Sequence, residues 1–442
     1  MAIMNRDEAR SILGKVIKLS KADGCEANLS GSREGNIRYA RNSVSTAGIT
    51  ENTDLVVQCN FGKQVGTATI NEFDDASLAK VVARAEETAR LAPESPEFMP
   101  VLGPQKYAES KAFVQGSADI APSYRADAAA ASIAPAKEAD ATAAGFLTDS
   151  SNFQAMMNSE GLFAYHTDTN VNFTVTVRTN DGTGSGWAAA DDNDVSRIDT
   201  SATSKVALQK ALASREAKAL EPGKYTVILE PDAAGALLGR MFFAFGARQT
   251  DEGRSFLSKK GGGSRLGEQV FDERVSAYGD PLDPRVPAAT WNSEGQPIGK
   301  LDVIKNGVVE NLFYSRYWAA EKEVEPVPQV NNLIMVGGDK TQDELIANTE
   351  RGILVSRLWY IRALDPQTQL YTGLTRDGTF YIEDGQIKYP VKNFRFNESP
   401  VIMLNNLDEL GQAKRIGLFG FSAMIPSMRI REFTFSSLSD AV

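Results

Sequence analysis

Most hydrolytic sites depend on histidine, and this chain contains only one, His166. Zinc sites of hydrolases typically take two or three histidine ligands, and serine or cysteine hydrolases need a histidine as general base. A single histidine cannot build the first kind of site, and it serves the second only beside a nucleophile. His166 lies in the segment AYHT (164–167) at the end of an expected strand, where we expect a surface or hydrogen-bonded side chain.

The serine and cysteine candidates for a nucleophile have weak support. Ser422 lies in GFSAM (420–424), which is not a nucleophile elbow because Met424 occupies the second glycine position of G-x-S-x-G. Cys25 follows an expected helix, and an ordinary partly buried cysteine is favoured there over a reactive thiol. With Cys59 as the only other cysteine, a disulfide framework is excluded and a reducing compartment is favoured.

Three other segments have residue types that bind ligands. Residues 337–341 (GGDKT) lack the leading glycine of a phosphate loop and place an aspartate before the lysine, so a turn that leads into a helix is favoured. Residues 191–194 (DDND) lack the spacing and glycine of a calcium loop, which favours a solvated hairpin rim. A triglycine beside Lys259 and Lys260 fits either a flexible connection or a mobile substrate loop, and its residues are Gly261, Gly262 and Gly263.

The composition excludes two classes of partner. The net charge is -10, and without a run of Lys or Arg the chain has no electrostatic footprint for nucleic acid or an anionic membrane. No stretch approaches the roughly 20 continuous apolar residues of a membrane helix, and the polar first nine residues are not a signal peptide. We expect a soluble cytoplasmic protein.

The pattern of elements predicts an α+β fold with two smaller N-terminal α/β units, 1–104 and 105–222, before a larger strand-rich C-terminal domain, 223–442. In the middle unit, an alanine-rich helix over 124–144 is expected to break at Pro135. The other expected helices are 5–23, 75–91, 200–219, 232–245 and 341–351. The expected strands are 27–29, 36–39, 54–61, 64–70, 143–151, 161–166, 170–179 and 225–229, followed by several hairpins.

Short motifs in the C-terminal part occur in one order over some two hundred residues. Each is weak alone, but together they are specific, and the chain resembles the TldD/PmbA family of metallopeptidase-like proteins. The motifs are VILEP (227–231), SRLGEQV (264–270), DP (280–281), WNSEGQP (291–297), VIKNGVV (303–309), NLIMVGG (332–338), LIANTERGILV (345–355) and IEDGQI (382–387).

The resemblance implies that active relatives bind zinc through His-Glu-x-x-x-His on the helix after the opening strand. Here Gly239 stands at the first histidine position, Arg240 at the glutamate and Ala244 at the second histidine. The family's late cysteine ligand should fall within 416–422, where Gly417, Phe419 and Gly420 stand and no cysteine exists. We therefore expect the PmbA/TldE-like branch, with no zinc in this chain and no metal ligands.

The function implied by the resemblance is peptide binding within an assembly that degrades or matures unfolded peptides. The expected partner is a homologous metal-bearing TldD-like subunit or a second copy, and the label "modulator of DNA gyrase" implies gyrase-targeting peptides rather than DNA. Candidate substrate contacts are Arg240 and the triglycine, with Arg240 pairing a substrate carboxylate or an acid such as Glu268. Two alternatives stay open, a non-enzymatic homodimeric scaffold and a hydrolase with a rebuilt site that uses residues such as His166 or Arg240.

Overall fold

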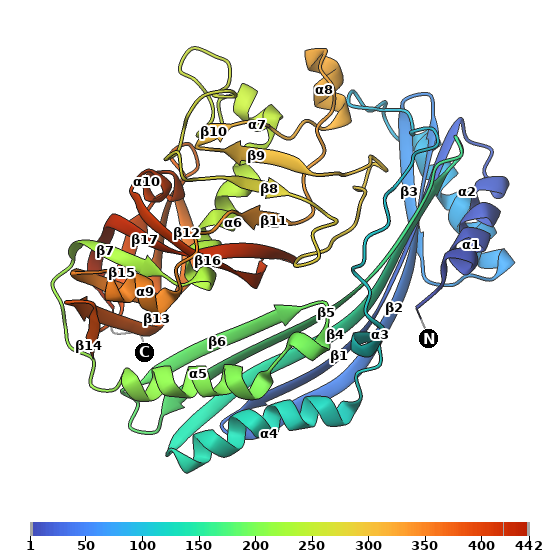
Figure 1. Ribbon diagram of the computed structural model, residues 1–442. Helices are drawn as coiled ribbons and strands as arrows, with labels where there is room; N and C mark the ends of the chain where they lie inside the picture. The colour runs from blue at the N-terminus through green and yellow to red at the C-terminus, as the bar shows by residue number, and fades with distance from the viewer. Residues whose placement is uncertain (1–2, 419, 440–442) are drawn as a thin grey trace.

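The protein folds into two sheets that face each other, as seen in a computed structural model that describes residues 3–418 and 420–439 (Figure 1). One sheet has six strands from the first half of the chain, and the other has eleven strands from the second half. The mixture of helices and strands, with a strand-rich C-terminal part, confirms the expected α+β class. Of the described helices, none combines the length and apolar character that a bilayer crossing requires.

The six-stranded sheet is antiparallel throughout, in the order β3-β2-β1-β4-β5-β6. Its strands are β1 (Gly24–Ala40), β2 (Ser43–Phe61), β3 (Gln64–Ile70), β4 (Ala141–Asn158), β5 (Phe163–Thr179) and β6 (Ser185–Asp192). Since β1 pairs with β4, residues from both of the expected N-terminal units share this one sheet.

Four helices cover the same face of this sheet: α1 (Arg6–Leu19), α2 (Asp75–Leu91), α4 (Pro122–Glu138) and α5 (Thr200–Ala213). Alternate strand residues such as Leu29, Phe153 and Phe173 are buried beneath them. Helix α5 lies so close that a Cβ on Gly186 would come within 2.2 Å of the Ala207 carbonyl oxygen, so only glycine fits. Because side chains alternate along a strand, the intervening residues all point to the opposite face.

The eleven-stranded sheet forms the core of the C-terminal half. Its strands are β7 (Gly223–Leu229), β8 (Ala277–Gly279), β9 (Leu301–Lys305), β10 (Val308–Val309), β11 (Leu333–Met335), β12 (Arg351–Asp365), β13 (Leu370–Glu383), β14 (Gln386–Pro390), β15 (Phe394–Glu398), β16 (Leu407–Leu418) and β17 (Phe421–Leu438). Helix α6 (Pro231–Phe242) packs Leu237, Leu238 and Met241 into this core. The remaining helices are α3 (Gln115–Ala118), α7 (Ala247–Asp251), α8 (Arg316–Lys322), α9 (Gln342–Ala347), α10 (Pro400–Asn405) and the short 3-10 turns η1 (Val195–Arg197) and η2 (Phe243–Phe245).

Several element boundaries differ from the expectations. Strand β5 is continuous where two strands were expected, because its polar stretch still pairs fully with β4. Helix α4 runs through Pro135 and ends at Glu138, since a proline in the last turn removes few backbone hydrogen bonds. The expected break is therefore wrong, and β4 begins at Ala141.

Candidate functional site

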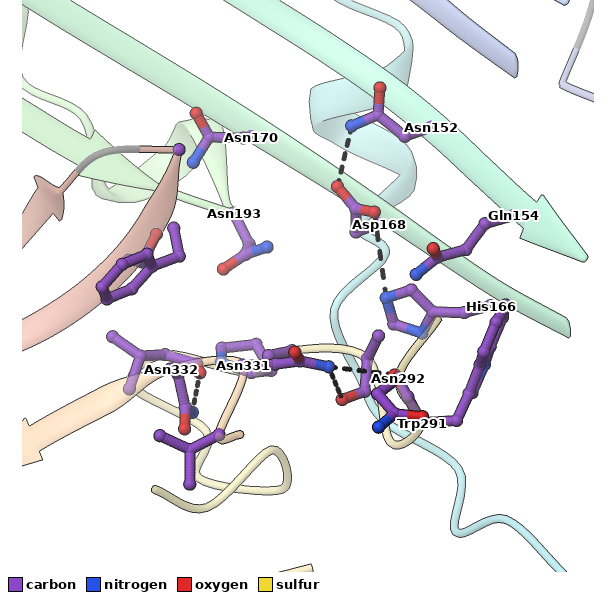
Figure 2. A pocket seen from close by; sticks show the side chains of 18 of the residues that line it. Asn152, Gln154, His166, Asp168, Asn170, Asn193, Trp291, Asn292, Asn331 and Asn332 are labelled. Atoms are coloured by element: carbon purple, nitrogen blue, oxygen red, sulfur yellow. Dashed lines mark hydrogen bonds and ion pairs between the residues drawn. The ribbon is translucent and has the colours of Figure 1, made fainter. Parts of the chain in front are cut away.

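A cleft with a volume of about 1170 Å³ lies between the two halves of the chain. One wall is the open face of the six-stranded sheet, and the other consists of C-terminal loops and the β16–β17 hairpin (Figure 2). Residues at every second position of β1, β4 and β5 enter the cleft together because they share one face of the sheet. They are Asn28, Ser30, Ser150, Asn152, Gln154, His166, Asp168, Asn170 and Asn172.

His166 and Asp168 form the only pair of titratable side chains facing each other on the described part of this wall. His166 Nε2 lies 3.8 Å from Asp168 Oδ2, which is an ion-pair distance too long for a hydrogen bond. Asn152, opposite on β4, donates to Asp168 Oδ1 at 2.8 Å. Burial lowers the pKa of His166 and raises the pKa of Asp168. His166 is 8% exposed, so the expected surface position is wrong.

The facing wall is shaped by asparagines that tie loops together. Asn331 donates to the carbonyls of Ala289 and Trp291 at 2.9 and 3.0 Å. Asn292 accepts from two backbone N–H groups of its own turn, at 3.0 and 2.9 Å. Figure 2 shows Trp291, Asn292, Asn331 and Asn332 lying across from His166 and Asp168. The family-like segments 291–297 and 332–338, far apart in sequence, therefore meet at this wall.

Two buried polar atoms of the cleft lining have no hydrogen-bond partner among the described residues. They are the indole Nε1 of Trp291, a donor, and Oδ1 of Asn193, an acceptor. The side-chain nitrogen of Asn193, in contrast, donates to the carbonyls of Ala112 and Thr169 at 3.1 and 2.6 Å. Both atoms are buried within the wall itself, so a ligand in the cleft would reach them only if the lining rearranged.

A buried ion pair joins the two walls at one end of the cleft. Arg415 of β16 lies 3.0 Å from Asp191 of β6, and both side chains are less than a tenth exposed. Ser422 accepts a hydrogen bond from Arg415 at 2.9 Å and donates to Asp191 at 2.8 Å. Ser422 is thus part of this clamp, and among the described residues it hydrogen-bonds to Arg415 and Asp191 and not to a histidine base. The expected solvated rim at 191–194 is wrong for Asp191 and Asn193, which are both buried.

The positions at which the resemblance places the family's metal ligands lie next to the cleft. Gly239 is buried in α6, Ala244 is buried in η2, and Arg240 is half-buried and donates to the carbonyl of Ala236. Burial lowers the pKa of Arg240. Phe243, beside Ala244, lines the cleft together with Gly417 and Gly420, whereas Phe419 lies outside the described residues. No group of three or more His, Cys, Asp or Glu suited to a metal occurs in the described chain.

The triglycine lies outside the cleft lining. Gly261, Gly262 and Gly263 are exposed, have positive φ angles and form a tight turn closed by the bond from Lys259 N to Gly263 O at 2.9 Å. The structure therefore does not bring this turn together with Arg240 at the cleft, and its substrate role stays a prediction. Glu268, considered as a partner of Arg240, pairs at the exposed surface with Lys259 at 2.7 Å.

The remaining motifs have structural explanations. Cys25 and Cys59 lie opposite each other on β1 and β2, both fully buried, with their Sγ atoms 3.8 Å apart. Contact with Cys59 and burial raise the pKa of Cys25, which disfavours the reactive thiolate. Thr341 caps α9 with a capping box, which confirms the expected turn that leads into a helix.

Sequence reasoning missed most of the cleft residues. The missed set is Asn152, Gln154, Asp168, Asn170, Asn172, Asn193, Trp291, Asn292, Asn331 and Asn332. A signal was present, because polar side chains occupy every second position from 166 to 172 and from 150 to 154 beside an apolar face. An unusually polar face on a long strand indicates contact with solvent or a ligand, but the pattern alone does not say which.

Three family models match consecutive parts of the chain. The model described as PmbA/TldA metallopeptidase domain 1 matches residues 25–89, the central-domain model matches 117–215, and the C-terminal-domain model matches 222–437. Together they cover most of the sequence and include both walls of the cleft.

Curated relatives and solved structures agree with these models. A metalloprotease of Methanothermobacter thermautotrophicus is 25% identical over 297 residues, which are 61% of this chain and 62% of that protein. Metalloprotease PmbA of Escherichia coli O157:H7 is 21% identical over 50% of this chain and 49% of that protein. The matches thus span less than two thirds of these relatives.

Two solved structures share the fold over almost the whole chain. TldE from Thermococcus kodakarensis has a TM-score of 0.87 at 18% identity and covers 97% of this chain and 99% of its own. A Thermotoga maritima protein described as a modulator of a DNA gyrase has a TM-score of 0.86 at 18% identity and covers 97% of this chain and 100% of its own. At this identity the likeness shows the fold.

Proposed function

We propose, because this chain belongs to the PmbA/TldA metallopeptidase family, that it is a peptide-binding subunit without a zinc site of its own. In this proposal a homologous metal-bearing subunit supplies the zinc and the base, and the assembly degrades or matures unfolded peptides. This chain holds the peptide and shapes the path to the metal.

The observation that carries the proposal is the chemistry of the cleft. Eight asparagines and two glutamines are among the residues that line it, and the described lining includes no lysine or arginine. A side-chain amide both donates and accepts hydrogen bonds, so it can pair with the N–H and C=O groups that every peptide carries. Such a wall suits extended chains of varied sequence, because backbone hydrogen bonds do not depend on side-chain identity.

The residues at the expected metal positions support the absence of zinc chemistry in this chain. Gly239 and Ala244 have no side chain that could coordinate zinc, and Arg240 puts a cation where a metal-bound water would need a base. The cleft nevertheless reaches this region through Phe243 and Gly417, so a peptide in it would pass the place where a relative holds its metal.

The test combines zinc content with peptidase activity. Zinc would be measured in the purified chain by mass spectrometry, and turnover of a fluorogenic unfolded peptide would be followed with the chain alone and mixed with the metal-bearing homologue of the same cell. We expect no zinc and no turnover alone, and chelator-sensitive turnover or altered cleavage in the mixture. Stoichiometric zinc or chelator-sensitive cleavage by the isolated chain would overturn the proposal.

The same experiment separates the two alternatives. A homodimeric scaffold would run as a stable pair and leave the activity of the homologue unchanged. A hydrolase with a rebuilt site would cleave the peptide alone and lose that activity in a His166→Gln variant, and the position of His166 beside Asp168 in the cleft is the observation that favours testing it.

A further inference from the structure

The charge in the cleft is unevenly distributed. Three of the described lining residues are titratable or acidic: His166, Asp168 and Asp191. Asp191 is neutralised by Arg415 and fully hydrogen-bonded within the clamp. Asp168 has no lysine or arginine partner, and its neighbour His166 is buried, which favours the neutral imidazole. Among the described residues, Asp168 is therefore the one carboxylate of the open cleft whose charge no lysine or arginine balances.

The Asp168 carboxylate also has spare hydrogen-bonding capacity. One oxygen accepts from Asn152 at 2.8 Å, and the other faces His166 at 3.8 Å, beyond hydrogen-bond distance. A carboxylate can accept about four hydrogen bonds. Its side chain is 31% exposed, toward the cleft that it lines. A ligand group with several N–H donors and a positive charge would fill this capacity.

We propose that Asp168 anchors a primary ammonium group of the bound peptide, either its N-terminal amine or a lysine side chain. This inference rests on the proposed function, since it names the substrate group that the same cleft recognises. An ammonium has three donors and no acceptor, so it complements the carboxylate and leaves the Asn152 contact in place.

The opposite wall offers the complementary contact. The side-chain amide of Gln329, an exposed residue of the cleft lining on this wall, is a donor that suits a peptide carbonyl. A peptide that places its ammonium on the sheet wall and a carbonyl toward Gln329 would contact both walls at once. Figure 2 shows Asp168 on the sheet wall and Asn331, from the segment that follows Gln329, on the facing wall.

The test uses one fluorescent decapeptide of alanine, glycine and threonine with a single central lysine, labelled at its C-terminus. Three versions are compared by fluorescence anisotropy: free amine with lysine, acetylated with lysine, and acetylated with glutamine at the lysine position. We expect the last version to bind the wild-type chain roughly tenfold or more weakly than the first, as loss of a charge-assisted hydrogen bond implies. The acetylated lysine peptide keeps only the lysine ammonium, so it identifies which ammonium is bound. It should bind like the first version if Asp168 holds the lysine, and like the last version if Asp168 holds the N-terminal amine.

The Asp168→Asn variant should bind all three versions with the weak affinity of the last one. Asp127→Asn is the matched control, because Asp127 is an exposed carboxylate of α4, on the covered face of the sheet, and its loss should change nothing. Binding that is equal for all three peptides, or that requires added zinc, overturns the ammonium site and leaves the proposed function standing. If the wild-type chain binds none of the peptides, both are wrong.

Discussion

Removal of Arg415 should destabilise the contact between the two halves of the protein. The Arg415 and Asp191 side chains are 8% and 6% exposed, so an Arg415→Met variant leaves a buried carboxylate without its cation. Breaking such a pair typically costs about 3–5 kcal/mol. Asp191 keeps its hydrogen bonds from Asn170 and Ser422, at 3.0 and 2.8 Å, so we expect the lower end, about 3 kcal/mol.

The assay is urea unfolding followed by tryptophan fluorescence, on the transition in which the halves separate. Lys224→Met is the control, because Lys224 and Glu432 form an ion pair that is 63% and 65% exposed and should contribute roughly 0–1 kcal/mol. A double-mutant cycle with Asp191→Asn isolates the pair, since the double variant removes both charges and should recover part of the loss. A loss below about 1 kcal/mol in Arg415→Met, or strict additivity in the cycle, would refute the reasoning.

Three further predictions concern other parts of the sheet. The imidazole NMR signals of His166, the only histidine, should titrate with a pKa below the ordinary 6.5, because burial disfavours the cation. The neutral imidazole then contributes to the free energy of unfolding above pH 6.5, and this contribution is lost as the pH falls through the folded pKa. A measured pKa above 6.5 would contradict this prediction. Asp149→Ala should cost about 3–5 kcal/mol in urea unfolding, since it leaves buried Arg125, now 2.5 Å from Asp149, without a counter-charge; a cost near zero would show that water reaches the site. Gly186→Ala should lower the free energy of unfolding by about 1–3 kcal/mol, because the new Cβ pushes α5 off the sheet. Gly48→Ala is the control and should be neutral, since its Cβ would meet open space. Equal melting temperatures for the two variants would contradict the close approach of α5.

In the proposed function, the positions expected for metal ligands are filled by residues that pack without a metal. Gly239 and Ala244 are buried among apolar neighbours of α6 and η2, and these positions pack into the core without a metal. The amide side chains of β4 and β5 line the opposite wall, on the other sheet, which packs against its own helices. On the proposed function, loss of the metal ligands would therefore leave the sheet wall of the cleft in place.

The local pattern of residues was sufficient for the family and the fold class. Ordered motifs such as WNSEGQP (291–297) identified the family, and the alternation of Val171, Phe173, Val175 and Val177 identified a half-buried strand. Both depend on short-range rules, namely the two-residue repeat of a strand and the chemistry of individual turns. The strand was confirmed, although it proved longer than expected.

Only the tertiary structure decided what the polar face of that strand does. The two-residue repeat places His166, Asp168 and Asn170 on one side of β5, but it does not say whether solvent or another domain lies opposite. That depends on how segments more than a hundred positions apart pack together. The ion pair of Asp191 with Arg415 and the positions of Asp168 and Trp291 on the same cleft are examples. Burial, and with it the lowered pKa of His166, arises from this long-range packing, which no local pattern encodes.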